Sequence, residues 1–239
     1  MKFKKKIRIK PFVPNVITIA SLCLGLTSIR LSFEGQFEKA VMLILIAGIM
    51  DFLDGKTARI LKVKSKLGEY LDSLVDMVSF GVAPMFLVYH FALFPFKKVG
   101  WIACLYFSMC MALRLARFNA MVEVEDEEKK FFVGVPAPLG AYIIMVPLLF
   151  FLETELYIFH NFILNFVFVW CAGFLMVSTI PVFSLKHLDF SKSHTRLWIL
   201  ILGSFLPFFY TNFYLMLGVV GLISIASIPF SYNYYTKNH

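Results

Sequence analysis

The sequence contains a series of apolar stretches, each long enough to cross a bilayer as a helix, separated by short polar segments. A transmembrane helix needs about 20 predominantly apolar residues. In lipid, only helices and closed barrels satisfy all of their backbone hydrogen bonds internally. We therefore predict an all-α polytopic membrane protein of one domain, with about eight spans at residues 14–33, 37–61, 67–94, 99–121, 136–153, 158–184, 196–211 and 213–234.

The composition also indicates a membrane protein. Of the 239 residues, 59% are hydrophobic and 16% are charged, and the mean hydropathy is +0.78. Soluble domains are typically about half apolar and about a quarter charged. The net charge of +8 is not carried by a soluble basic domain, so we expect no nucleic-acid partner.

The lysine and arginine residues predict an orientation, because cytoplasmic segments of membrane proteins are enriched in both. With the N-terminus inside, only four of the 23 such residues would lie outside: Arg30, Lys39, Lys97 and Lys98. Both termini and the turn after the second span are then cytoplasmic. We expect the first span to be uncleaved. The basic residues within 1–13 should lie on the anionic surface of the inner (cell) membrane, amid its lipids.

Four aspartates interrupt the apolar pattern on the second and third predicted helices. Asp51 and Asp54 are three residues apart, and Asp72 and Asp76 are four apart, so each pair shares a helix face. Converging carboxylates repel one another unless a cation lies between them. Oxygen ligands of this kind suit Mg²⁺, Mn²⁺ or Ca²⁺. The sequence therefore predicts a divalent-metal site on the second and third helices, facing the cytoplasm.

Small residues accompany the acids. Gly55 and Ala58 fall on the face of the first pair, and Gly68 falls on the face of the second. Glycine inside a helix costs up to ~1 kcal/mol relative to alanine, so these positions require a reason. They either leave room for a bulky ligand beside the metals or allow two membrane helices to pack closely.

The acids form part of a longer pattern, D-x2-D-G-x2-A-R-x8-G-x3-D-x3-D, which begins at Asp51 and ends at Asp76. It resembles the signature of the CDP-alcohol phosphotransferase family, whose members transfer a phosphoryl-linked group from a CDP-linked donor to an alcohol and release CMP. The resemblance implies two ions, Mg²⁺ or Mn²⁺, held by Asp51, Asp54, Asp72 and Asp76, with Asp76 as catalytic base. It also implies a CDP-binding set: Asn15, Thr18, Asp54, Gly55, Ala58, Arg59 and Gly68.

Asn15 and Thr18 belong to a P-N-x-x-T opening of the first span. On chemistry alone, both side chains could donate to a ligand near the acids, cap the helix or bond a neighbouring backbone group. The resemblance favours the ligand, because family members often carry a similar opening.

Two arginines, Arg114 and Arg117, lie three residues apart in an otherwise apolar fourth span. A buried guanidinium needs an anionic partner, whereas a pair at the interface could extend to water. The RLARFN segment and the following F-x-G-x-P-x-P turn resemble one branch of the family, whose membrane-embedded enzymes use CDP-diacylglycerol and L-serine. The resemblance runs from about residue 14 to about residue 186.

The branch resemblance implies that Arg114, Arg117 and Lys186 bind serine or phosphate, and that the enzyme is a homodimer. We expect a basic juxtamembrane segment (1–13), a catalytic core of six spans (14–186), and a cytoplasmic loop with two C-terminal spans (187–239). Glycerol 3-phosphate, an inositol phosphate or an archaeal ether lipid remains an alternative substrate. A divalent-cation transporter is the alternative of another class, although its ion site is expected near the bilayer midplane, often with inverted repeats.

Overall fold

The structure, a computed structural model, describes residues 12–61, 65–122, 132–133, 135–178, 181–182 and 212–238. Its described part is helical apart from one short antiparallel strand pair. The α-helices are α1 (Phe12–Phe33), α2 (Phe37–Ile60), α3 (Lys66–Asp76), α4 (Ala83–Val88), α5 (Lys97–Val122), α6 (Ala137–Thr154), α7 (Phe162–Val177) and α9 (Phe213–Asn238). A π-helical turn, Met77–Val82, joins α3 and α4 into one long column, and a second π-helical turn, Tyr89–Leu93, continues the column after α4. The strands are β1 (Phe132–Val133) and β2 (Pro181–Val182).

Three described helical segments are long and apolar enough to cross a membrane: Phe12–Phe33, Lys66–Ala120 and Ala137–Thr154. Two shorter apolar helices are Phe162–Val177 and Phe213–Ala226. The α2 helix, with 24 residues, is also long enough to cross but carries the first acid pair. The predicted all-helical membrane class is therefore confirmed.

Within the described residues, the bounds predicted for the helices agree with those observed, except near the sixth predicted span. There the helix α7 occupies Phe162–Val177 instead of 158–184. Its start is set by Asn161, whose side-chain oxygen accepts hydrogen bonds from the backbone N–H groups of Ile163 and Leu164. The predicted seventh span, 196–211, lies outside the described residues.

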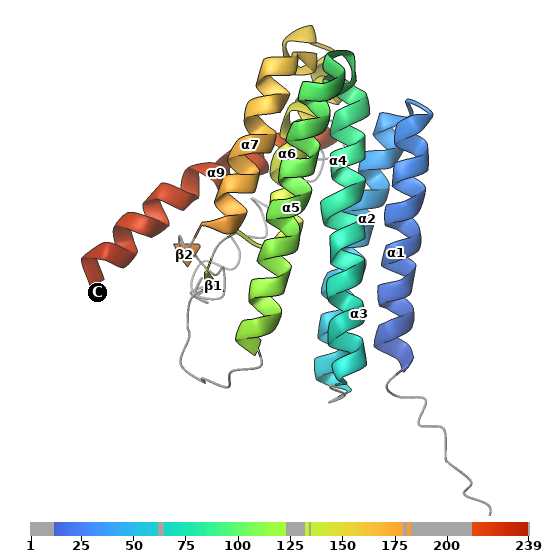
Figure 1. The fold of residues 1–239 in the computed structure, drawn as a ribbon, viewed down its shortest axis with the longest axis vertical. Coiled ribbons are helices and arrows are strands. Elements are labelled where there is room, and N and C mark those ends of the chain that lie inside the picture. The colour runs from blue at the N-terminus through green and yellow to red at the C-terminus, as the bar shows by residue number, and fades with distance from the viewer. Residues whose placement is uncertain are drawn as a thin grey trace, which may run out of the picture.

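The helices form an elongated bundle. Figure 1 shows α1 and α2 side by side, the α3–α4 column next to them, and α5, α6 and α7 on the other side, while α9 runs obliquely away from the bundle. The start of α1, the end of α2, the start of α3 and the end of α5 lie at the lower end in this view. We call this the site end, because the four aspartates lie towards it.

Hydroxyl groups and a glycine bring α1 close to its neighbours. The Ser21 hydroxyl donates to the carbonyl of Ala47 on α2 at 3.2 Å, and the Ser79 hydroxyl donates to the Ser21 carbonyl at 3.2 Å. A Cβ on Gly25 would lie 2.7 Å from Ser79 Oγ, so α1 can approach the column this closely only without a side chain there. Small residues at such crossings are typical of membrane helix packing. These contacts fix α1 relative to both helices that carry the acids.

The column changes from α-helix to π-helix at Met77, directly after Asp76. A π-turn widens the helix locally and alters the faces that follow it, and such turns are frequent at functional sites. Below the turn, Asp72 and Asp76 share one face of α3. Within the turn, Ser79 and Phe80 are buried against the rest of the bundle. The turn thus separates the polar end of the column from its apolar core.

Candidate metal centre

The structure brings three of the four predicted acids together. One carboxylate oxygen from each of Asp51, Asp72 and Asp76 lies within 4.8 Å of the other two. The first residue belongs to α2 and the other two to α3, and all three side chains are half-buried. The group therefore bridges the two helices.

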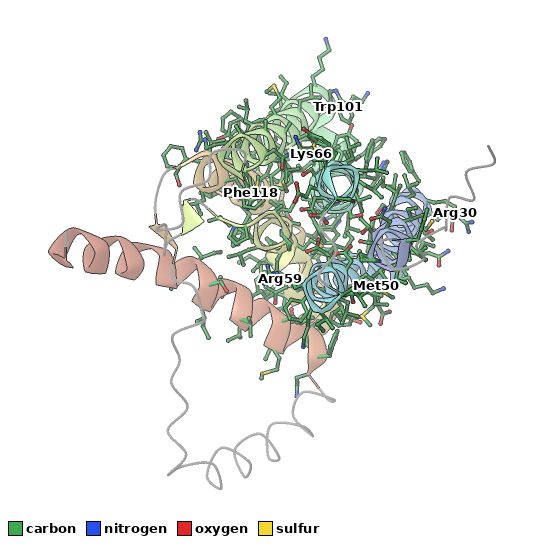
Figure 2. The ribbon with its side chains drawn as sticks, turned by 90° about the horizontal axis from the view of Figure 1, so that it is seen from below. Arg30, Met50, Arg59, Lys66, Trp101 and Phe118 are labelled. Carbon is green, nitrogen blue, oxygen red and sulfur yellow. The ribbon has the colours of Figure 1, made fainter. Side chains whose placement is uncertain are left out.

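The packing of the helices explains why α2 and α3 approach each other through their carboxylate side chains and not through their backbones. The helix α1 packs against both α2 and α3, whereas α2 and α3 make little direct backbone contact. Figure 2 views the site end: Arg59, Lys66 and Phe118 lie on α2, α3 and α5, and α1 lies beside α2 and α3. The two acid-bearing helices, α2 and α3, thus form a three-helix arrangement with α1, which packs against both of them.

The three converging side chains fit a divalent cation. Among the described residues, no lysine or arginine forms an ion pair with any of the four aspartates. Like charges this close repel each other strongly unless a cation lies between them. The donor set consists only of carboxylate oxygens, which Mg²⁺, Mn²⁺ and Ca²⁺ prefer over softer ligands.

Asp54 lies apart from this group and has its own partner. The Thr18 hydroxyl on α1 donates to Asp54 Oδ2 at 2.6 Å. Both side chains are only 5% exposed. The same Thr18 oxygen lies 3.0 Å from the carbonyl oxygen of Pro14, one turn earlier in α1. The structure therefore shows Thr18 in contact with an acid of the motif on a neighbouring helix and with a backbone carbonyl of its own helix.

The glycines of the motif have different surroundings. A Cβ on Gly68 would lie 3.2 Å from Asn15 Oδ1 and 3.1 Å from Ser65 Oγ, so Gly68 lets the Asn15 side chain approach α3. Ser65 caps α3 by accepting the Gly68 N–H at 3.0 Å. At Gly55, in contrast, no atom lies within 4 Å of a Cβ position. Open space beside the acids is therefore found at Gly55.

Two further motif residues, Ala58 and Arg59, lie between Gly55 and the end of α2. Ala58 is half-buried and Arg59 is exposed. The exposed guanidinium of Arg59 is available to a ligand that approaches from the site end. Binding of CDP by these residues remains a prediction.

The two arginines of α5 are half-buried and bonded to backbone. Arg114 donates through Nε to the carbonyl oxygen of Val135, just before α6. Arg117 donates through Nη1 to the carbonyl oxygen of Val177, the last residue of α7, at 2.9 Å. A guanidinium has five N–H donors, so each arginine keeps others for a ligand. Binding of serine or phosphate by either arginine remains a prediction, and Lys186 lies outside the described residues.

One contact near the acids was not anticipated from the sequence. The hydroxyl of Ser73, adjacent to Asp72, donates to Asn119 Oδ1 on α5 at 3.0 Å. Asn119 is the last residue of RLARFN, so its position in that segment was the only available signal. Ser73 and Asn119 connect the acid-bearing α3 to the helix that carries both arginines.

Comparisons with known proteins place this arrangement in context. Residues 11–178 match the family model of CDP-alcohol phosphatidyltransferase. A CDP-diacylglycerol–serine O-phosphatidyltransferase from Mycobacterium leprae is 36% identical over 226 residues, which cover 92% of this chain and 74% of that protein. Proteins of the same name from Helicobacter pylori and Methanocaldococcus jannaschii are 34% and 31% identical, over 79% and 70% of this chain and 78% and 72% of theirs.

Proposed function

This chain belongs to the CDP-alcohol phosphatidyltransferase family, and on that premise we propose that it transfers the phosphatidyl group of CDP-diacylglycerol to the hydroxyl of L-serine and releases CMP. The observation that carries the proposal is the convergence of Asp51, Asp72 and Asp76 at the motif that the family resemblance identifies. The names of similar proteins in two bacteria and an archaeon support serine as the acceptor.

The reaction exchanges one phosphorus–oxygen bond for another. The serine hydroxyl oxygen attacks the phosphorus next to diacylglycerol, the bond from that phosphorus to the CMP oxygen breaks, and the hydroxyl proton passes to a carboxylate oxygen of Asp76. When bound, two Mg²⁺ or Mn²⁺ ions would neutralise the donor diphosphate and the charge that develops on CMP. Asp51, Asp54, Asp72 and Asp76 would hold those ions.

The remaining residues would bind and orient the substrates. The open space at Gly55 supports a position for the CDP group along the end of α2, beside Ala58 and Arg59. Asn15 borders the same site end from α1, next to Gly68. Mostly apolar helix surfaces would contact the acyl chains of the donor.

Serine carries a carboxylate that needs a cationic partner, and the arginines of α5 are suitable. Arg114 lies on α5, which packs against the π-turn that directly follows the proposed base, Asp76. Arg117 keeps free N–H groups for a two-point contact with a carboxylate. We place the serine carboxylate on Arg117 and Arg114, and a phosphate group on Lys186.

Replacing Arg117 with lysine is expected to raise the serine KM by about tenfold, because lysine cannot make the planar two-point contact. Binding of CDP-diacylglycerol should change little. Steady-state kinetics with serine varied, and donor binding measured without serine, separate the two effects. If the variant loses donor binding and keeps its serine KM, Arg117 serves the donor phosphates and the serine site lies elsewhere.

The orientation follows from the lysine and arginine distribution. We propose eight spans in the inner membrane, with both termini and the site end in the cytoplasm, where the nucleotide is released. We also propose that the chain divides into the three parts 1–13, 14–186 and 187–239, and that it forms a homodimer.

A cysteine introduced at Ser65, the cap of α3 at the site end, tests this orientation. In a background with Cys23, Cys104, Cys110 and Cys171 replaced by serine, a membrane-impermeant thiol reagent should label Ser65→Cys only after the cells are opened. A cysteine at Lys98, at the opposite end, should react in intact cells. Efficient labelling of Ser65→Cys from outside would contradict the cytoplasmic site.

The choice of acceptor is tested by supplying serine, glycerol 3-phosphate and inositol phosphate separately to the purified protein with CDP-diacylglycerol and Mn²⁺. CMP release should depend on serine. Release with glycerol 3-phosphate and none with serine would exclude serine while leaving family membership unchanged. A transporter is disfavoured, because Asp51 and Asp54 belong to the second half of α2, and Asp72 and Asp76 belong to α3, and the end of α2 and the start of α3 lie at the site end (Figure 1).

A further inference from the structure

The hydrogen bond between Thr18 and Asp54 joins two helices through buried polar groups. Its length is 2.6 Å, and its two residues are 36 positions apart in the sequence. At 5% exposure, both side chains are buried, so little of either is accessible to water. Bonds from a hydroxyl to an ionised carboxylate are shorter and stronger than those between neutral groups. The contact is therefore a specific feature of the site end.

We infer that Thr18 is a positioning residue that holds Asp54 in the orientation needed for metal binding. The inference rests on the proposed function, which makes Asp54 a metal ligand. Asp54 differs from the other three acids in lying outside their group. With Oδ2 held by the hydroxyl, the carboxylate has less freedom to rotate, so its direction towards an ion is restricted. Partners that hold metal ligands in this way typically change metal affinity by about 10- to 100-fold when removed.

The structure also explains how Thr18 is itself held in place. About one turn further along α1, the Ser21 hydroxyl donates to the carbonyl oxygen of Ala47 on α2. The carbonyl oxygen of Ser21 accepts a hydrogen bond from the Ser79 hydroxyl. The branched side chain of threonine has few rotamers in a helix, so its hydroxyl direction is restricted. Asp54 is therefore oriented by a residue of α1, a helix that is itself fixed against α2 and against the column that contains α3.

Three variants test this role through Mn²⁺ affinity, measured on the purified full chain by electron paramagnetic resonance without substrate. Thr18→Val keeps the shape and removes the donor, and should weaken Mn²⁺ binding by about tenfold or more. Thr18→Ser keeps the donor and should bind Mn²⁺ as wild type does. Thr27→Val is the matched control, because the exposed Thr27 hydroxyl donates only within α1, to the Cys23 carbonyl at 2.7 Å.

The thermal midpoint in the presence of a chelator separates positioning from folding. The inference expects Thr18→Val to lose Mn²⁺ affinity while remaining folded. If valine prevents folding, the smaller Thr18→Ala replaces it in the same comparison. In an Asp54→Ala background, Thr18→Val should cause no further loss, because its effect passes through Asp54.

Unchanged Mn²⁺ affinity in folded Thr18→Val, or an equal loss in Thr18→Ser, would overturn the positioning role. An additional loss in the Asp54→Ala background would do the same. Wild-type protein that shows the expected Mn²⁺ pattern but transfers no phosphatidyl group would refute the proposed function and leave the Thr18–Asp54 relation standing. The two failures are thus distinguishable.

Discussion

Replacing Asp72 with asparagine is expected to lower the rate of CMP release by on the order of 10³-fold or more, or ~4 kcal/mol in the barrier. Asp72 contributes one of the three oxygens that lie within 4.8 Å of one another. An amide removes one negative charge from the site and weakens its attraction for a divalent ion. Mn²⁺ affinity should therefore fall together with turnover.

The same substitution should leave the fold intact. Without a divalent ion, Asp51, Asp72 and Asp76 repel one another, so neutralising one of them relieves repulsion. In a chelator, Asp72→Asn should therefore unfold at a temperature at least as high as wild type does. Glu69→Gln is the matched control, because Glu69 is an exposed acid one turn earlier on α3 and should keep full activity. Near-normal turnover in Asp72→Asn would contradict the metal centre.

A second large effect is expected at Gly55, where activity and stability should change in opposite directions. Apart from the adjacent helix backbone, no atom lies within 4 Å of a Cβ at this position, so a methyl group meets no steric obstacle in the protein. Replacing glycine by alanine in a helix stabilises it by up to ~1 kcal/mol. If the space holds the CDP group, Gly55→Leu should raise the KM for CDP-diacylglycerol by about tenfold or more, from ~1–3 kcal/mol of overpacking.

The control for Gly55 lies on the same helix. A Cβ on Gly48 would make an ordinary contact, 3.8 Å from the ring of Phe80. Gly48→Ala should therefore leave the donor KM unchanged, whereas the Gly55→Ala and Gly55→Leu variants should raise it progressively. Kinetics with the donor varied and thermal unfolding of each variant provide the data. Normal donor kinetics in Gly55→Leu would place the CDP group elsewhere.

The sequence predicted most of the helices, because a span is specified by a local property, the length of an apolar run. It was less successful where local capping competes with hydropathy. The residues before α7 are mostly apolar, yet Asn161 starts the helix by accepting hydrogen bonds from two backbone N–H groups. The π-turn after Asp76 has no hydropathy signal either, because its apolar residues are equally compatible with an α-helix.

The candidate site was predictable to the extent that it depends on spacing within helices. The intervals between the acids placed each pair on one helix face, and the structure brings Asp51 together with Asp72 and Asp76. Contacts between distant helices carry no such periodic signal. The bond from Thr18 to Asp54 and the bond from Ser73 to Asn119 depend on how α1, α2, α3 and α5 pack.

The central claim is that the serine hydroxyl replaces CMP on the phosphatidyl group, and isotopic labelling of that hydroxyl tests it most directly. Purified protein would receive CDP-diacylglycerol, Mn²⁺ and serine whose hydroxyl carries heavy oxygen. The account predicts phosphatidylserine that retains the label in its phosphodiester bridge, unlabelled CMP in equal amount, and neither product when a chelator is present. CMP release without labelled phosphatidylserine would contradict it.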